Sequence, residues 1–84
     1  MDSETRLGFI GIVLDNREVT DAVNHIIGAY SLVVKARIGV PNNTSAAAVI
    51  GLIVEGDNLL IGSLTAKLGN LQGVQVKSAL AKQK

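Results

Sequence analysis

Hydrophobic and polar positions follow two different periods along this chain, and each change of period marks a new element. Residues Leu7–Leu14 and Ala46–Val54 are nearly unbroken apolar runs, which predicts two buried strands. Residues 32–40 and 74–79 alternate between apolar and polar side chains, as strands with one solvated face do. Two amphipathic helices are predicted where apolar residues recur every three or four positions: Val19, Ala22, Val23, Ile26, Ile27 and Tyr30, then Leu60, Ile61, Leu64, Leu68 and Leu71.

The resulting order of elements, β-α-β-β-α-β, predicts an α+β protein of the ferredoxin-like class, with two helices on one face of a four-stranded antiparallel sheet. In that fold the first and third strands are central, and they correspond here to the two continuous apolar runs. The predicted strand order is therefore 4-1-3-2. We expect one domain, residues 1–84, with an ordered core over residues 6–79. The predicted helix-side core is Ile10, Ile12, Val19, Val23, Ile26, Val34, Ile50, Leu52, Leu64, Leu68 and Val76.

The two central strands pose a problem, because a sheet with helices on one side only normally has a polar free face. In both strands, the residues expected to face away from the helices are apolar or glycine. An apolar patch of this kind usually marks an interface. We therefore predict a homo-oligomer, either a dimer or a tetramer; scattered exposed aliphatic residues are the alternative interpretation. The predicted interface residues are Phe9, Val13, Val49 and Ile53, with a polar rim of Lys35, Arg37, Gln75 and Lys77.

Composition and charge argue against several functions. Eight Lys and Arg residues against seven Asp and Glu give a net charge of +1, which disfavours a strongly basic nucleic-acid-binding protein. Phe9 and Tyr30 are the only aromatic residues, so we expect no direct binding of nucleic acid by base stacking either. The polar N-terminal segment lacks the features of a secretory signal, and the apolar runs are half the ~20 residues of a transmembrane helix. These features predict a cytoplasmic protein that does not bind membranes.

Side chains that could carry out catalysis are scarce. The chain has no cysteine and one histidine, His25, which we expect on the exposed side of its helix. Four of the seven carboxylates lie near predicted helix starts, where such groups cap backbone amides: Asp15, Glu18, Asp21 and Asp57. Asp15 and Glu18 have the spacing of a capping box. We therefore predict that the protein is not an enzyme and has neither a metal site nor a cofactor.

Four segments together resemble the small iron-only hydrogenase system regulator family: GFIGIV at 8–13, RIGVP at 37–41, LTAKLG at 64–69 and GVQVKS at 73–78. The resemblance extends from Arg6 to Ala79. It implies an ACT-like form of the ferredoxin-like fold, an oligomer, and a presumed regulatory role, control of transcription included, beside hydrogenase maturation genes. The family is also similar in fold to the ligand-binding half of nickel-responsive repressors. This chain lacks their cluster of histidines and cysteine and their DNA-binding arm, so we do not predict a metal sensor.

The resemblance to ACT-like modules also implies where a small effector would bind, namely near the turn after the first strand or in the adjacent loops. The candidate residues are Asp15 and Asn16 of that turn, and Arg37, Gly39, Pro41, Asn42 and Asn43 of a polar segment. Arg37 offers a forked donor for a carboxylate or phosphate, although a solvated loop is the alternative interpretation. The partner would be a small-molecule effector or a hydrogenase-maturation protein. The alternative functions are a generic ACT-like amino-acid-binding domain and a purely structural protein-interaction subunit.

Overall fold

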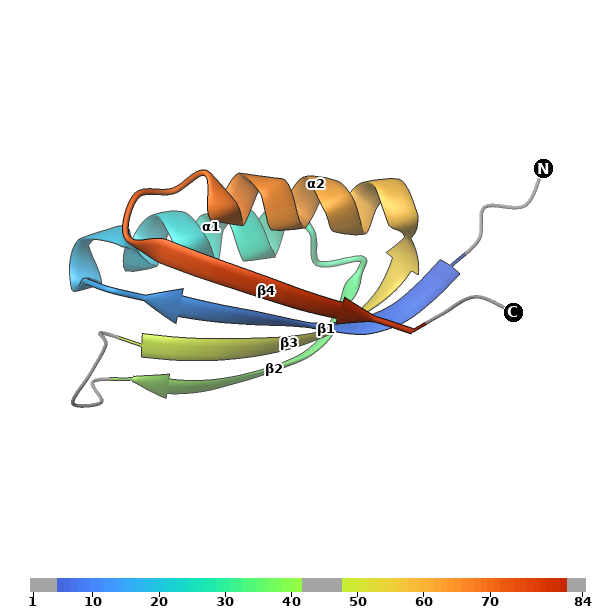
Figure 1. The fold of residues 1–84 in the computed structure, drawn as a ribbon, viewed down its shortest axis with the longest axis horizontal. Helices are drawn as coiled ribbons and strands as arrows, with labels where there is room; N and C mark the ends of the chain where they lie inside the picture. The colour runs from blue at the N-terminus through green and yellow to red at the C-terminus, as the bar shows by residue number, and fades with distance from the viewer. Residues whose placement is uncertain (1–4, 42–47, 82–84) are drawn as a thin grey trace.

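Four strands pair into one antiparallel sheet, and two helices lie across one of its faces (Figure 1). The structure is a computed structural model, and it describes residues 5–41 and 48–81. The elements in chain order are β1 (Thr5–Leu14), the 3-10 turn η1 (Arg17–Val19), α1 (Thr20–Ala29), β2 (Val34–Pro41), β3 (Ala48–Asp57), α2 (Asn58–Gly69) and β4 (Val74–Leu80). The strand order β2-β3-β1-β4 is the predicted order 4-1-3-2 counted from the other edge. The ferredoxin-like fold class is therefore confirmed.

The central strands β1 and β3 pair over their full length, from Thr5 opposite Asp57 to Leu14 opposite Ala48. β4 pairs with the other edge of β1, and β2 with the other edge of β3. Opposite residues in an antiparallel pair project to the same face of the sheet. The register therefore assigns the strand residues to a helix-covered face and to a free face.

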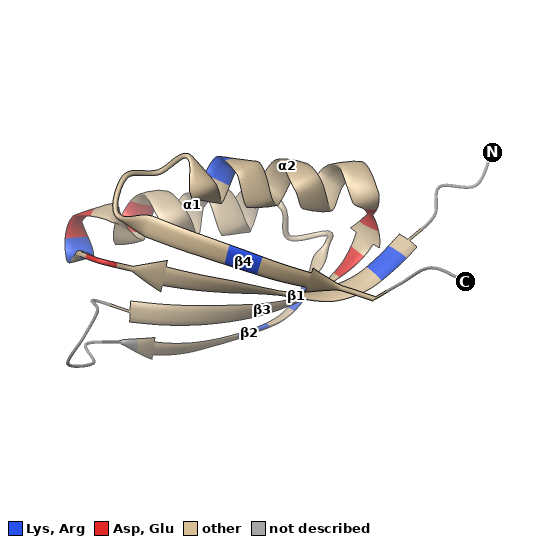
Figure 2. Ribbon diagram, viewed as in Figure 1, with Lys and Arg blue, Asp and Glu red and all other residues tan. Residues whose placement is uncertain are grey.

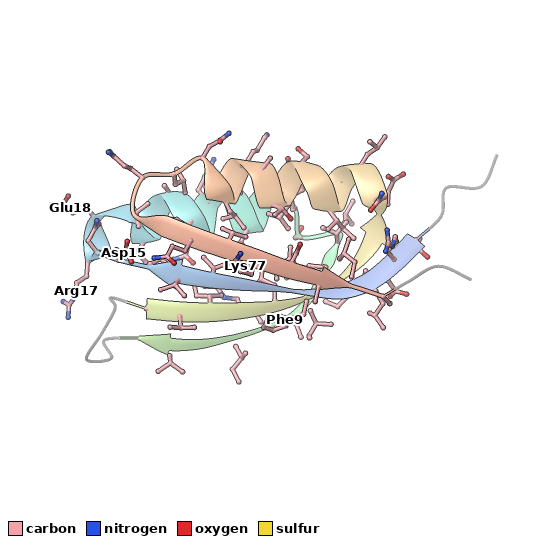
Figure 3. All side chains as sticks on the ribbon, viewed as in Figure 1. Phe9, Asp15, Arg17, Glu18 and Lys77 are labelled. Carbon is pink, nitrogen blue, oxygen red and sulfur yellow. The ribbon has the colours of Figure 1, made fainter. Side chains whose placement is uncertain are left out.

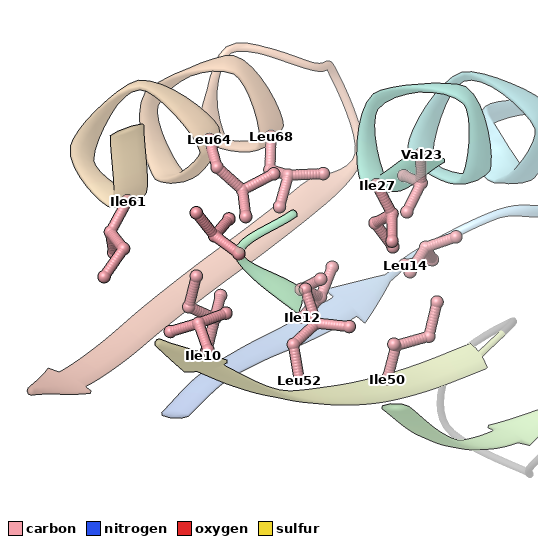
Figure 4. Close-up of a cluster of buried hydrophobic side chains, with 12 residues drawn as sticks. Ile10, Ile12, Leu14, Val23, Ile27, Ile50, Leu52, Ile61, Leu64 and Leu68 are labelled. Carbon is pink, nitrogen blue, oxygen red and sulfur yellow. The ribbon is translucent and has the colours of Figure 1, made fainter. Parts of the chain in front are cut away.

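The hydrophobic core lies between the helices and the sheet (Figure 4). Seven of the predicted core residues are buried: Ile10, Ile12, Val23, Ile50, Leu52, Leu64 and Leu68. The other four predicted residues are half-buried against this cluster: Val19, Ile26, Val34 and Val76. Five residues absent from the predicted core complete it: Leu14, Ile27, Val33, Val54 and Ile61. The twelve buried hydrophobic residues are all aliphatic, so the core stabilises the fold by removing apolar surface from water.

Side-chain caps begin η1 and α2, whereas α1 has none of its own, and only the cap of α2 is the predicted one. Asp57 caps α2, because its Oδ1 accepts the backbone N–H of Leu59 at 2.7 Å. The capping box predicted for Asp15 and Glu18 is wrong. Asn16 is the cap instead, and its Oδ1 accepts the backbone N–H of Glu18 at 3.0 Å. This cap opens η1, and α1 follows directly after it.

A bulge in β2 changes which of its residues face the helices. The register against β3 shifts between Val34 and Ala36, which leaves Lys35 as an extra residue. Val33 is buried in the core, and its neighbour Val34 also packs against the core. Two consecutive residues thus turn inward, and the strict alternation predicted for residues 32–40 is wrong.

Beyond the bulge, the two faces of β2 are the reverse of those predicted. Ile38 lies opposite Gly51 on the free face, where it is 72% exposed, and not toward the helices. Arg37 lies opposite the buried Leu52 on the helix side, where its Nη2 donates to Oδ1 of Asn24 in α1 at 2.8 Å. The prediction that Arg37 belongs to the rim of the free face is therefore wrong.

Candidate functional site

A surface hollow of about 500 Å³ lies where the connection after β1 meets the connection before β4. Its lining residues are Asp15, Asn16, Glu18, Val19, Ala22, Gln72 and Gly73. The two connections come together because β1 and β4 pair with Leu14 opposite Val74. The hollow thus contains the predicted turn residues Asp15 and Asn16. It also contains Gln72 and Gly73, which no sequence signal marked as site residues.

Backbone and side-chain contacts hold the two connections against each other. The backbone N–H of Asp15 donates to the carbonyl oxygen of Gly73 at 2.8 Å. Gly73 has a φ of 81°, in the left-handed region that favours glycine. A Cβ at this position would also lie 3.0 Å from Nδ2 of Asn16. A larger residue at position 73 would therefore strain the turn and press on the Asn16 cap.

The polar groups of this hollow are acidic or neutral. The carboxylates of Asp15 and Glu18 and the amides of Asn16 and Gln72 line it, and no Lys or Arg side chain of the described residues does. Figure 2 shows acidic positions together with the basic position of η1 at this end of the molecule, and Figure 3 shows Asp15, Arg17 and Glu18 around the turn. Carboxylate and amide oxygens accept hydrogen bonds from ammonium groups, and carboxylates repel phosphates. The lining therefore suits a cationic or amine-bearing ligand.

Arg37 and Gly39, from the second predicted ligand segment, line a different hollow. This hollow measures about 200 Å³ at the β2 edge and includes Thr20 and Asn24 of α1. It shares no lining residue with the hollow at the β1–α1 connection. The guanidinium of Arg37 is bonded to Asn24 across it. The structure therefore separates Arg37 and Gly39 from the turn residues with which they were grouped.

The other residues predicted in that segment follow at the end of β2. Pro41 is the last residue of the strand and lies opposite Ala48. Asn42 and Asn43 lie outside the described residues. Because Ala48 is also opposite Leu14, the ends of β1 and β2 and the start of β3 lie at the same end of the sheet.

The free face of the sheet carries four residues predicted to form an interface: Phe9, Val13, Val49 and Ile53. Figure 3 shows Phe9 on the side of the sheet away from the helices. Ile38 and Val40 extend the same apolar surface from β2, since they lie opposite Gly51 and Val49. The bulge placed them there, and no local sequence signal marks the bulge.

A polar contact joins the two helices. Tyr30 Oη and Ser63 Oγ are 2.7 Å apart, and Lys67 Nζ lies 5.5 Å from the centroid of the Tyr30 ring. The hydrogen bond from Ser63 stabilises the phenolate and lowers the pKa of Tyr30 below its ordinary value of 10.0. Partial burial opposes this shift, and the positive charge of Lys67 adds to it.

The titration of Tyr30 tests this contact. Tyr30 is the only tyrosine and the chain has no tryptophan, so ultraviolet absorbance of the phenolate reports this residue alone. We expect a titration midpoint below 10.0 in the native protein. Ser63→Ala should raise the midpoint, because the phenolate loses its hydrogen-bond donor. Ser78→Ala, a matched change at an exposed residue of β4, should leave it unchanged; equal midpoints in all three proteins would contradict the assignment.

Within residues 5–41 and 48–81, no three His, Cys, Asp or Glu side chains form a group that could hold a metal ion. His25 is exposed on α1. Neither helix of this part of the chain is long and apolar enough to span a membrane.

Several solved structures share this arrangement of strands and helices. The ACT domain of the GTP pyrophosphokinase from Chlorobium tepidum has a TM-score of 0.65 at 17% identity, over 94% of this chain and 89% of that one. CPII, a nitrogen regulatory PII-like protein of Thiomonas intermedia K12 solved with ADP, AMP and bicarbonate, has a TM-score of 0.51 at 16% identity, over 98% and 96% of the two chains. These likenesses concern the fold alone. They show that the chain has the ferredoxin-like fold in the arrangement found in an ACT domain.

A more similar solved structure and a family model show to which family the chain belongs. The uncharacterized protein TM1266 from Thermotoga maritima has a TM-score of 0.88 and 35% identity, over 94% of this chain and 100% of that one. The model of the TM1266-like family matches residues 6–78. The description of this family is a presumed regulator of the iron-only hydrogenase system. The chain belongs to this family, as its four sequence segments predicted. A search of curated proteins gives no match.

Proposed function

We propose that this chain is a non-catalytic, cytoplasmic regulatory module of the iron-only hydrogenase system that responds to a small effector. We place the effector in the hollow at the β1–α1 connection. Membership of the TM1266-like family supports the regulatory role, which is the family's presumed one. The ACT-like fold and the hollow support binding of a small ligand, since such ligands occupy concave sites with a few convergent polar groups.

One observation carries this proposal: Asp15, Asn16, Glu18 and Gln72 converge on one hollow of about 500 Å³. Small-molecule sites typically measure roughly 300–1,000 Å³. Two connections that are far apart in the sequence line it, and the hydrogen bond between Asp15 and Gly73 ties them together. A ligand in the hollow would bridge both connections and so stabilise the folded state.

The lining favours an effector with an amino group. Its ammonium would meet the carboxylates of Asp15 and Glu18, and the amides of Asn16 and Gln72 would accept or donate further hydrogen bonds. An amino acid fits this set of groups, because its own carboxylate can accept from the amide N–H groups. The PII-like protein CPII was solved with ADP and AMP. Phosphates in this hollow would meet two carboxylates, so we expect nucleotides to bind here more weakly than amines.

A thermal-shift screen of amino acids, polyamines and nucleotides tests the proposal. At 100 times its Kd, a ligand that binds only the folded state raises the free energy of unfolding by about 2.7 kcal/mol. Glu18→Gln keeps the shape of the side chain but removes one charge, so the shift caused by an amine should fall sharply. Glu55→Gln changes an exposed carboxylate of β3 outside the hollow and should keep the full shift.

Two results would count against this function. Equal amine-induced shifts in the Glu18→Gln and Glu55→Gln variants would contradict the site. If no small molecule shifts the melting temperature, but a purified hydrogenase-maturation protein forms a stable complex with the chain, a structural interaction subunit becomes the better assignment.

A further inference from the structure

The free face of the sheet carries most of the large hydrophobic residues that are exposed in the described part of the chain. Nine large hydrophobic residues are exposed in the described part of the chain, and six of them lie on this face: Leu7, Phe9, Ile38, Val40, Val49 and Ile53. They are contiguous, since Phe9 lies opposite Ile53 and Val49 lies opposite Val40. Soluble proteins seldom expose a contiguous apolar patch of this kind unless something binds it.

The centre of this face is shallow because of two glycines. Gly11 and Gly51 lie opposite each other in β1 and β3, and the ring of Phe9 lies over both. A Cβ on Gly51 would lie 2.8 Å from Cε1 of the ring, and one on Gly11 would lie 3.3 Å from Cε2. Side chains at these positions would lift the ring, whereas glycines let it lie down on the sheet. Beside the ring is a hollow of about 370 Å³, lined mainly by apolar side chains.

Charge is sparse on this face. By register, the charged residues of the described strands that project to it are Lys77, opposite Gly11, Glu55, opposite Leu7, and Asp57, opposite Thr5 at the end of β3. Lys77 lies in β4 at one edge of the sheet (Figure 3), and Glu55 lies near the end of β3. The centre formed by β3 and β1 is uncharged. A strongly charged partner would therefore find no complementary charge there, but an equally apolar and shallow surface would fit.

We infer that a second copy of this chain covers the free face, sheet against sheet. The inference rests on the fold and does not depend on the proposed effector. The four strands have 10, 8, 10 and 7 residues. At ~4.8 Å between strands and ~3.3 Å per residue they cover roughly 550 Å², so a pair of sheets buries about 1,100 Å². A specific interface needs about 1,000 Å².

Two twisted sheets stack with their strands within about 30° of each other. A two-fold axis parallel to the strands places β1 on the partner's β3 and β4 on the partner's β2. Phe9 then faces the partner subunit's Ile53, and the aliphatic stem of Lys77 faces the partner subunit's Ile38. A two-fold axis across the strands through the Gly11–Gly51 row would instead stack Lys77 on the partner subunit's Lys77. Repulsion between these charges selects the first arrangement.

Light scattering and sedimentation equilibrium of the full chain test the inference at protein concentrations from micromolar to 100 micromolar. We expect the mass of a dimer, or of a tetramer built from such dimers. Ile38→Lys should lower the mass toward that of the subunits, because two lysines would be buried in the interface. Leu59→Lys is the matched control, since Leu59 is 82% exposed but lies on α2, and its mass should equal that of the native protein. Both side chains are largely exposed, so circular dichroism should show an intact fold in both variants.

The direction of the two-fold axis is tested by comparing a positive with a negative charge at position 38. Ile38→Glu would place a carboxylate against the partner subunit's Lys77, so its dimer Kd should be about threefold to tenfold tighter than that of Ile38→Lys. Equal dimer Kd values for Ile38→Lys and Ile38→Glu would overturn the two-fold axis parallel to the strands. A native monomer at 100 micromolar, or an oligomer that Ile38→Lys and Phe9→Lys both leave intact, would overturn the inference itself.

Discussion

Replacing Leu64 with alanine should lower the free energy of unfolding by about 3 kcal/mol, while the same replacement at Leu59 should change it by less than about 0.5 kcal/mol. Both leucines belong to α2, but Leu64 has no exposed surface and Leu59 is 82% exposed. The truncation at Leu64 loses the transfer free energy of the side chain and leaves a cavity in the twelve-residue core. Leucine and alanine have similar helix propensities, so the difference between the two variants reports packing.

Urea denaturation followed by circular dichroism measures both values, at one fixed protein concentration so that association does not enter the comparison. Small domains have a total stability of about 5–15 kcal/mol, so the Leu64→Ala variant should lose a large share of it. A loss below about 1 kcal/mol at Leu64 would contradict the core between α2 and the sheet.

Two glycine-to-alanine substitutions should change stability in opposite directions. Gly8 lies in β1 opposite Leu80 of β4. A Cβ on Gly8 would press on Cδ2 of Leu80 and lie 2.8 Å from the carbonyl oxygen of Ala79. The leucine tip can rotate away, but the carbonyl belongs to the sheet backbone, so Gly8→Ala should force β4 outward. We expect a loss of about 2 kcal/mol, as for other overpacked sites.

Gly62 provides the matched control. It lies inside α2, and a Cβ there would meet no atom within 4 Å. Gly62→Ala should therefore stabilise the protein by about 0.5–1 kcal/mol, because glycine loses more backbone freedom in a helix than alanine does. The same urea titrations measure both variants. If Gly8→Ala left the unfolding midpoint unchanged or raised it, the close approach of β1 and β4 would be wrong.

The fold class could be read from the chain because the two kinds of strand differ in composition. Residues 7–14 and 46–54 are apolar on both faces, which favours a central place in the sheet over an edge, where charged residues are common. Their place at the centre of the sheet follows from that, and the strand order follows from the order of elements. Phe9 and Ile53 could be assigned to the free face because side chains along β1 and β3 point to alternate faces without a bulge.

The faces of β2 could not be read in this way, because a contact from a distant part of the chain breaks its alternation. Val33 packs onto Gly56, where an added Cβ would lie 2.5 Å from Cγ1 of the valine. Its carbonyl oxygen accepts the backbone N–H of Glu55 at 2.9 Å. Val34 then also packs against the core, and the bulge at Lys35 absorbs the extra residue. Each later side chain of β2 therefore changes face, which brings Ile38 to the free face.

In the hollow at the β1–α1 connection, likewise, some lining residues could be predicted from the sequence and others could not. Asp15 and Asn16 stand out in the sequence, because they follow a buried strand and precede a helix. Gln72 and Gly73 show no such signal, since a glycine near the end of a helix is common in any helical protein. Pairing of Leu14 with Val74 brings the two connections together, and the hydrogen bond from Asp15 to Gly73 holds them there. Local periodicity encodes strands and helices, whereas a site made from two connections 57 residues apart depends on which strands become neighbours in the folded sheet.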